Sequence, residues 1–94
     1  MTSNNEVQES HGTVKVPEKR QWRERAAVAV VNLAQRFQSD ILLCAGTLCI
    51  DAKSSLMALM MMDALKGQLL ELTARGADSV QALRELSGVF EAKP

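Results

Sequence analysis

The stretch DILLCAGTLCID, Asp40–Asp51, predicts a β-hairpin, and the rest of the chain is interpreted outward from it. Gly46–Thr47 separates two apolar runs and suits a two-residue type II′ turn, which takes glycine at its first central position. This turn places Cys44 opposite Cys49, at a spacing that permits a disulfide. Because we find no secretion signal, we expect a reducing compartment, and we predict that both cysteines are small, reduced sheet or core residues.

Upstream of the hairpin, the sequence predicts a short strand and a helix. Thr13–Val16 alternates between polar and apolar residues, as a strand does. Apolar residues then recur at three- and four-residue steps, which predicts an amphipathic helix over Arg23–Gln38. The first residues, MTSNNEVQESHG, are polar. We therefore expect residues 1–11, which include the only histidine, His11, to form a flexible tail ahead of one domain over residues 12–94.

Downstream of the hairpin, the sequence predicts a short helix followed by a strand. Ser54 or Ser55 is suited to cap the helix, which continues through the methionine-rich run LMALMMM. Gln68–Gly76 predicts a strand with its apolar residues on one face. These residues are Leu70, Leu72 and Ala74.

The last predicted element is a helix over Ala77–Glu91. Asp78 is suited to cap it, and Gln81 completes a capping-box pattern three residues later. Its predicted apolar stripe consists of Val80, Leu83, Leu86 and Phe90.

Strands and helices therefore alternate in the order strand, helix, strand, strand, helix, strand, helix. An apolar sheet face and apolar helix faces bury one another most simply as layers. The pattern predicts an α+β fold, with a four-stranded, mostly antiparallel sheet and three helices on one face.

Composition excludes several classes of function. The 94 residues carry no net formal charge, and they include three aromatic residues and no tyrosine. A chain with no net charge and few aromatic residues has little electrostatic attraction for nucleic acid or an anionic membrane and few side chains on which bases can stack. No apolar run reaches the roughly 18 residues of a membrane span. We expect a cytoplasmic protein that binds neither nucleic acid nor membrane.

The sequence also lacks the patterns of a cofactor-dependent or metal-dependent enzyme. It contains one histidine and two cysteines, with no cluster of metal ligands around them. No glycine-rich phosphate loop is present. We predict no enzymatic activity, no cofactor and no metal.

Three segments, in order and at matching spacing, resemble HPr, the histidine-containing phosphocarrier of the bacterial sugar phosphotransferase system. They are RAAVAVVNLAQRFQSDILL from position 25, GTLCIDAKSSLMALMMM from position 46 and KGQLLELTARGADSVQAL from position 66. The resemblance implies the open-faced β-sandwich of that family, with element order βαββαβα.

The chain departs from the family just before its first helix. HPr proteins carry Gly-Leu-His-x-Arg-Pro-Ala-Ala there, and the histidine takes a phosphoryl group from enzyme I and passes it to sugar-specific proteins. Aligning Ala26–Ala27 with the paired alanines puts Trp22 at the histidine. Glu24 then stands at the arginine and Arg25 at the proline. Since an indole cannot accept a phosphoryl group and Glu24 repels one, the resemblance implies that this site has no catalytic residue.

Two interpretations of the basic junction stay open. In the first, Trp22, Arg23 and Arg25 form a docking spot for an acidic partner, because tryptophan and arginine are enriched in interface hot spots. In the second, the arginines are solvated and Trp22 folds over the helix start.

The second predicted helix carries two further candidate sites through the resemblance. Ser54 matches the position at which many HPr proteins are phosphorylated by a dedicated kinase, although it is also explained as a helix cap. Leu56 and Leu59 match positions that stay exposed and dock onto protein partners. We expect Met61 and Met62 to lie in the core.

The leading hypothesis is a non-catalytic HPr homologue that regulates by docking onto phosphotransferase or regulatory proteins. It is similar in kind to the catabolite-repression HPr-like protein, which has Gln at the histidine position. Two alternatives remain open: a phosphocarrier whose acceptor has moved to His11, and an oligomerising structural module that forms a homodimer.

Overall fold

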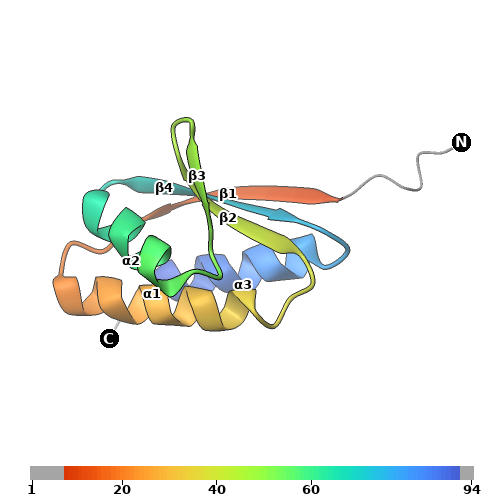
Figure 1. The fold of residues 1–94 in the computed structure, drawn as a ribbon, viewed down its shortest axis with the longest axis horizontal. Helices are drawn as coiled ribbons and strands as arrows, with labels where there is room; N and C mark the ends of the chain where they lie inside the picture. The colour runs from red at the N-terminus through yellow and green to blue at the C-terminus, as the bar shows by residue number, and fades with distance from the viewer. Residues whose placement is uncertain (1–7, 92–94) are drawn as a thin grey trace, which may run out of the picture.

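The computed structural model describes residues 8–91, and within this range it contains a single four-stranded sheet with three helices on one face (Figure 1). The predicted α+β class and element order are confirmed. The elements are β1 (Glu9–Lys15), α1 (Arg20–Ala34), β2 (Asp40–Ala45), β3 (Leu48–Asp51), α2 (Ser55–Ala64), β4 (Leu69–Arg75) and α3 (Ser79–Glu91).

The sheet has the strand order β1-β4-β2-β3, and every neighbouring pair is antiparallel. Alternate residues of each strand point to opposite faces. On β4, the predicted apolar residues Leu70, Leu72 and Ala74 are fully buried and point toward the helices. The opposite face of the sheet has no helix packed on it in the described chain, and we call it the open face.

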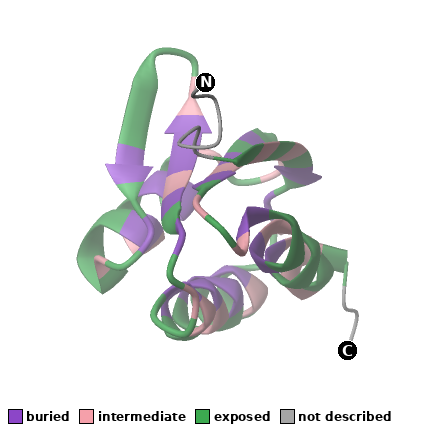
Figure 2. Cartoon of the chain, turned by 90° about the vertical axis from the view of Figure 1, so that its right-hand side faces the viewer, coloured by how far each residue is buried: buried purple, intermediate pink, exposed green. Residues whose placement is uncertain are grey.

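The core lies between the sheet and the helices, where the buried segments of both layers face each other (Figure 2). Helix α1 lies between the other two helices and packs against both α2 and α3. The largest fully buried apolar side chains come from every layer; they are Val16, Val30, Ile41, Leu43, Met62, Leu70, Leu72 and Leu86.

The hairpin has the predicted turn and register. Cys44 pairs with Cys49 and Ala45 with Leu48, across the turn Gly46–Thr47. Gly46 has a φ of 62°, and no residue other than glycine has a positive φ in the described chain. A positive φ at the first central residue alone is the property of a type II′ turn.

Strand β1 begins earlier than predicted. Glu9 pairs with Arg75 of β4, and Glu9 Oε2 lies 2.8 Å from Arg75 Nε. Because β4 extends this far, β1 gains partners that its own sequence does not reveal. His11 therefore lies in a strand, and its predicted place in a flexible tail is wrong; the first seven residues of that tail lie outside the described residues.

Helix α1 is shifted toward the N-terminus relative to its prediction. It begins at Arg20 rather than Arg23 and ends at Ala34 rather than Gln38. Its N-cap, Lys19, makes no side-chain capping bond. The usual Ser, Thr, Asp or Asn signal of a helix start is thus absent, and the periodic apolar residues that led to the prediction begin only at Ala26, six residues after the helix start.

The predicted capping box of α3 is wrong. The Asp78 carboxylate accepts from the backbone N–H groups of Gln38 and Ser39 and from the Ser39 hydroxyl. Gln81 donates to Glu85 instead of the helix start. Asp78 therefore holds the α1–β2 loop rather than its own helix.

The apolar stripe of α3 is only partly as predicted. Leu86 is buried, and Leu83 and Phe90 pack against the core. Val80, however, is 57% exposed, and Ala82 takes the buried position in the first turns of the helix.

Candidate functional site

The candidate site is the turn in which the β1–α1 loop becomes helix α1. The N–H groups of Trp22 and Arg23 both donate to the Lys19 carbonyl oxygen at 3.1 Å. Trp22 is therefore the third residue of the helix and lies inside its first turn. The N–H groups of the two residues before it have no partner within the helix, as at any helix start.

Arg23 is buried, with 7% of its surface exposed. Its Nε donates to Asp63 Oδ1 of α2 at 3.0 Å. Its Nη1 donates to the backbone carbonyl oxygens of Pro17 and Glu18. Arg23 thus ties the β1–α1 loop to α2, and both sequence interpretations of it, as a docking residue and as a solvated side chain, are wrong.

Trp22 and Arg25 lie on the other flank of α1. Trp22 is half-buried, and the guanidinium carbon of the exposed Arg25 stands 4.8 Å from the centroid of its ring. This is a cation–π contact, which holds the Arg25 side chain against the indole. The structure brings these two predicted docking residues together and separates them from Arg23.

Glu24 projects into solvent between the two flanks. Its Oε2 accepts from Arg20 Nε at 3.1 Å, one helical turn away. Counting this pair, the arginines of the first two turns each have a partner within the chain: Arg20 has Glu24, Arg23 has Asp63 and Arg25 has Trp22.

Helix α2 exposes an apolar surface. Leu56 is 67% exposed and Met60 is 58% exposed, and Met57 is exposed beside them. We call these residues the α2 patch. Leu59, by contrast, is half-buried and packs against the core, so the exposure that the resemblance implies for it is found only in part. The sequence analysis missed Met57 and Met60, which occupy the same outward side of the helix as Leu56.

Two structural predictions for α2 are confirmed, the burial of two methionines and the helix cap. Met61 and Met62 are buried. Ser54 is the N-cap, and its hydroxyl oxygen accepts from the Met57 N–H at 3.3 Å. The Ser54 hydroxyl therefore lies at the start of α2, directly beside the α2 patch.

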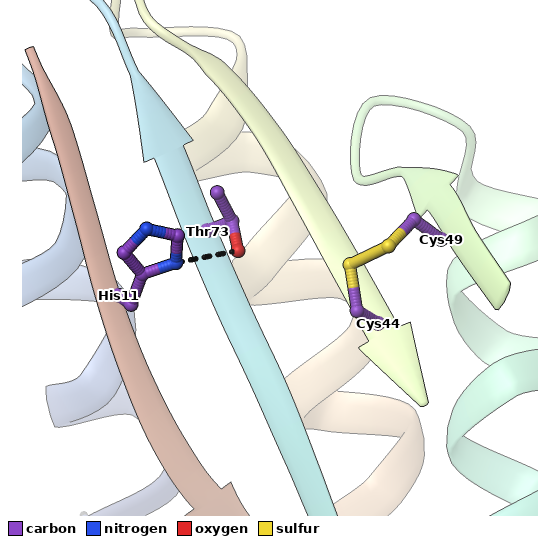
Figure 3. Close-up of a disulfide and its surroundings, with 4 residues drawn as sticks. All are labelled: His11, Cys44, Cys49 and Thr73. Atoms are coloured by element: carbon purple, nitrogen blue, oxygen red, sulfur yellow. Dashed lines mark hydrogen bonds between the residues drawn. A yellow bond between two sulfur atoms is a disulfide. The ribbon is translucent and has the colours of Figure 1, made fainter. Parts of the chain in front are cut away.

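The open face of the sheet carries His11 and the two cysteines (Figure 3). His11 Nδ1 lies 3.2 Å from Thr73 Oγ1, and Nε2 lies 3.1 Å from Glu9 Oε1. Cys44 and Cys49 form a cross-strand disulfide, so the prediction that they are reduced is wrong. The register that permits the bond was predicted, whereas the oxidation state was inferred only from the expected compartment.

His11 is far from the start of α1. Lys15, the last residue of β1, is four positions further along the strand, which corresponds to about 13 Å before the connecting loop begins. Within residues 8–91, no group of three or more His, Cys, Asp or Glu side chains is placed to hold a metal ion. None of the described helices has the length and apolar character that crossing a bilayer requires.

The βαββαβα order and the antiparallel sheet with helices on one face define an open-faced α+β sandwich, and comparison with known proteins identifies its family. Residues 11–92 match the model of the PTS-HPr family, described as "PTS HPr component phosphorylation site". The chain belongs to this family.

Individual relatives agree with this assignment. The chain is 38% identical to phosphocarrier protein HPr of Treponema pallidum over 81 residues, which cover 86% of this chain and 91% of that protein. The solved structure of HPr-C-His from Thermoanaerobacter tengcongensis superposes with a TM-score of 0.74 at 27% identity, covering 87% and 91% of the two chains. Crh, the catabolite repression HPr of Bacillus subtilis, gives a TM-score of 0.64 at 30% identity, covering 90% and 100%.

Proposed function

We propose that this chain is a regulatory member of the HPr family that docks onto protein partners without relaying phosphoryl groups through the start of α1. A relay needs a nucleophile with a free lone pair, and a histidine supplies one near neutral pH. If Ala26–Ala27 are aligned with the paired alanines of the family, Trp22 stands at that position. Its indole nitrogen is a donor only, so it cannot attack phosphorus.

The single observation that carries the proposal is that the arginines at the start of α1 are already engaged within the chain. A transferred phosphoryl group is stabilised by donors that converge on its oxygens. Arg23 is buried against Asp63 and two backbone carbonyls, and Arg20 is paired with Glu24. The Glu24 carboxylate adds a negative charge within the first two turns of α1, and this charge opposes a phosphate.

Docking is supported by the α2 patch. A contiguous group of exposed apolar side chains on a small domain is a common mark of a protein interface. Leu56, Met57 and Met60 form such a group, and two of the three are methionines, which adapt their shape to a partner. The proposed partners are proteins of the phosphotransferase or regulatory type.

Titration of enzyme I with this chain tests the docking proposal. We expect Leu56→Asp to weaken binding on the order of tenfold or more, because it places a charge in the apolar contact. Val80→Asp is the matched control, since Val80 is similarly exposed but lies on α3. Equal affinities for the two variants, or no binding of the unmodified chain, would contradict the proposal.

Ser54 is the proposed site of regulation. A phosphate on its hydroxyl would lie at the start of α2, where unpaired N–H groups and the helix dipole favour negative charge. It would also stand beside the α2 patch and change what that surface binds. An HPr kinase should label the chain but not its Ser54→Ala variant, and equal labelling of both would place the modification elsewhere.

A further inference from the structure

A groove of about 970 Å³ runs between α1 and α3, which lie side by side beneath the sheet (Figure 1). We call it the α1–α3 groove. It opens to solvent on the flank of α1 that faces away from α2. Its lining residues come from the end of β1, the following loop and the two helices; those used below are Lys15, Lys19, Trp22, Arg25, Ala29 and Phe90.

The groove exists because small residues follow a large one along one stripe of α1. Trp22, Arg25, Ala26 and Ala29 stand at positions i, i+3, i+4 and i+7, so they share one side of the helix over about 10 Å. The two alanines form a low floor. Trp22 of α1 and Phe90 of α3 contribute the two aromatic side chains of the lining.

The rim of the groove is basic in a chain that has no net charge. Lys15, Lys19 and Arg25 line it against a single carboxylate, that of Glu18. Both lysines are exposed, and Arg25 is held over the indole of Trp22. The groove therefore combines an apolar floor with cations along its edge.

We infer that the α1–α3 groove binds an acidic amphipathic segment of a partner protein, an inference that rests on the proposed docking function and names the chemistry of one contact. Helices lay apolar side chains at i, i+3, i+4 and i+7 into grooves of this kind. Such side chains would fill the alanine floor, and carboxylates beside them would meet Lys15, Lys19 and Arg25. Charge complementarity of this type gives specificity and a fast association.

A second copy of the chain fits the groove less well. Among the described helices, α2 exposes the most large apolar side chains, those of the α2 patch, and this helix has one acidic residue, Asp63. That carboxylate is bound to Arg23. The apolar helix of a second copy would therefore leave the rim cations without partners.

Synthetic peptides of about four helical turns test the inference, with Leu and Phe at i, i+3, i+4 and i+7 and either Glu or Lys at the remaining positions. Trp22 is the only tryptophan of the chain, so its fluorescence reports binding directly. We expect the Glu peptide to shift this fluorescence and to bind more weakly as NaCl is raised from about 0.05 to 0.5 M. The Lys peptide should not bind.

Two variants locate the contact. Lys15→Glu with Lys19→Glu should weaken binding of the Glu peptide about tenfold or more, because it reverses the rim charge while leaving the Arg25–Trp22 contact in place. Arg36→Glu with Arg84→Glu makes the same change in net charge at exposed positions outside the groove and should have little effect. Ala29→Phe fills the floor of the groove and should also weaken binding. Val28→Phe, at the exposed position directly before Ala29 and outside the groove, should not weaken it.

The inference is overturned if the Glu peptide fails to bind at about 1 mM, if the Lys peptide binds equally well, or if the Lys15/Lys19 variant binds unchanged. A homodimer in light scattering that Ala29→Phe dissociates would assign the groove to a second copy and also overturn it. These failures are separate from failure of the proposed function. Loss of enzyme I binding would contradict the docking proposal and leave the peptide result standing, whereas loss of peptide binding alone contradicts only the groove.

Discussion

The two flanks of α1 use similar residues in opposite ways. On the α2 flank, Arg23 is buried and bound to Asp63 and the loop carbonyls. On the α3 flank, Arg25 is exposed over Trp22 at the edge of a groove. Two residues advance a helix by about 200°, so Arg23 and Arg25 point to opposite sides of α1. Basic residues that are close together in the sequence of a helix therefore do not form one surface, because helix geometry places their side chains in different environments.

The largest expected effect comes from removing the contacts that Arg23 makes on the α2 flank. Arg23→Ala should lower the free energy of unfolding by about 3 kcal/mol, because it removes a buried cation and leaves the acceptors around it unsatisfied. Urea denaturation measures this change. Arg25→Ala is the matched control and should change stability by less than about 0.5 kcal/mol, since Arg25 is exposed. Similar losses for the two variants would remove the distinction between the flanks.

The second effect concerns the disulfide of the β2–β3 hairpin. This hairpin leads into α2, the helix that Arg23 contacts. The disulfide joins residues separated by five positions, and closing so short a loop contributes roughly 2 kcal/mol. Cys44→Ser with Cys49→Ser should lose about that much in oxidising buffer. In the presence of a strong reductant, the variant and the unmodified chain should have nearly the same stability. A gap that persists after reduction would show that the serines, not the missing bond, destabilise the hairpin.

The smallest expected effect tests the contact between Asp78, just before α3, and the α1–β2 loop. The pKa of Asp78 lies below its ordinary value of 3.8, chiefly because the Ser39 hydroxyl and then the Gln38 N–H donate to its carboxylate. A depressed folded-state pKa means that this contribution is present above about pH 4 and is lost as the pH falls through the folded-state value. Asp78→Asn should therefore be less stable than the unmodified chain at pH 7, and the difference should narrow below pH 4. A difference that is constant with pH would exclude this role.

Local sequence signals predicted the features that depend on neighbouring residues. Gly46 predicted the two-residue turn, and the turn in its place predicted the register in which Cys44 lies opposite Cys49. Ser54 supplied a recognisable helix cap. The buried face of β4 followed from two-residue periodicity alone.

The features that the sequence did not reveal depend on distant partners. Arg23 is buried because Asp63, 40 residues away, meets it on α2. Asp78 has the residue type and position of a helix cap, but the loop 39 and 40 residues before it takes its carboxylate. His11 lies in a strand because β4 extends to Arg75. The groove likewise needs α3, whose Phe90 lines it together with the alanines of α1.

The central claim is that the start of α1 no longer accepts a phosphoryl group, and incubation of the chain with enzyme I and labelled phosphoenolpyruvate tests it most directly. A family member that retains the histidine serves as the positive control, and His11→Gln as the second sample. The account predicts no acid-labile label on this chain while the control is labelled. Label on His11 that passes to a sugar-specific acceptor would contradict the regulatory role, and acid-labile label that persists in the His11→Gln sample would contradict the claim about the start of α1.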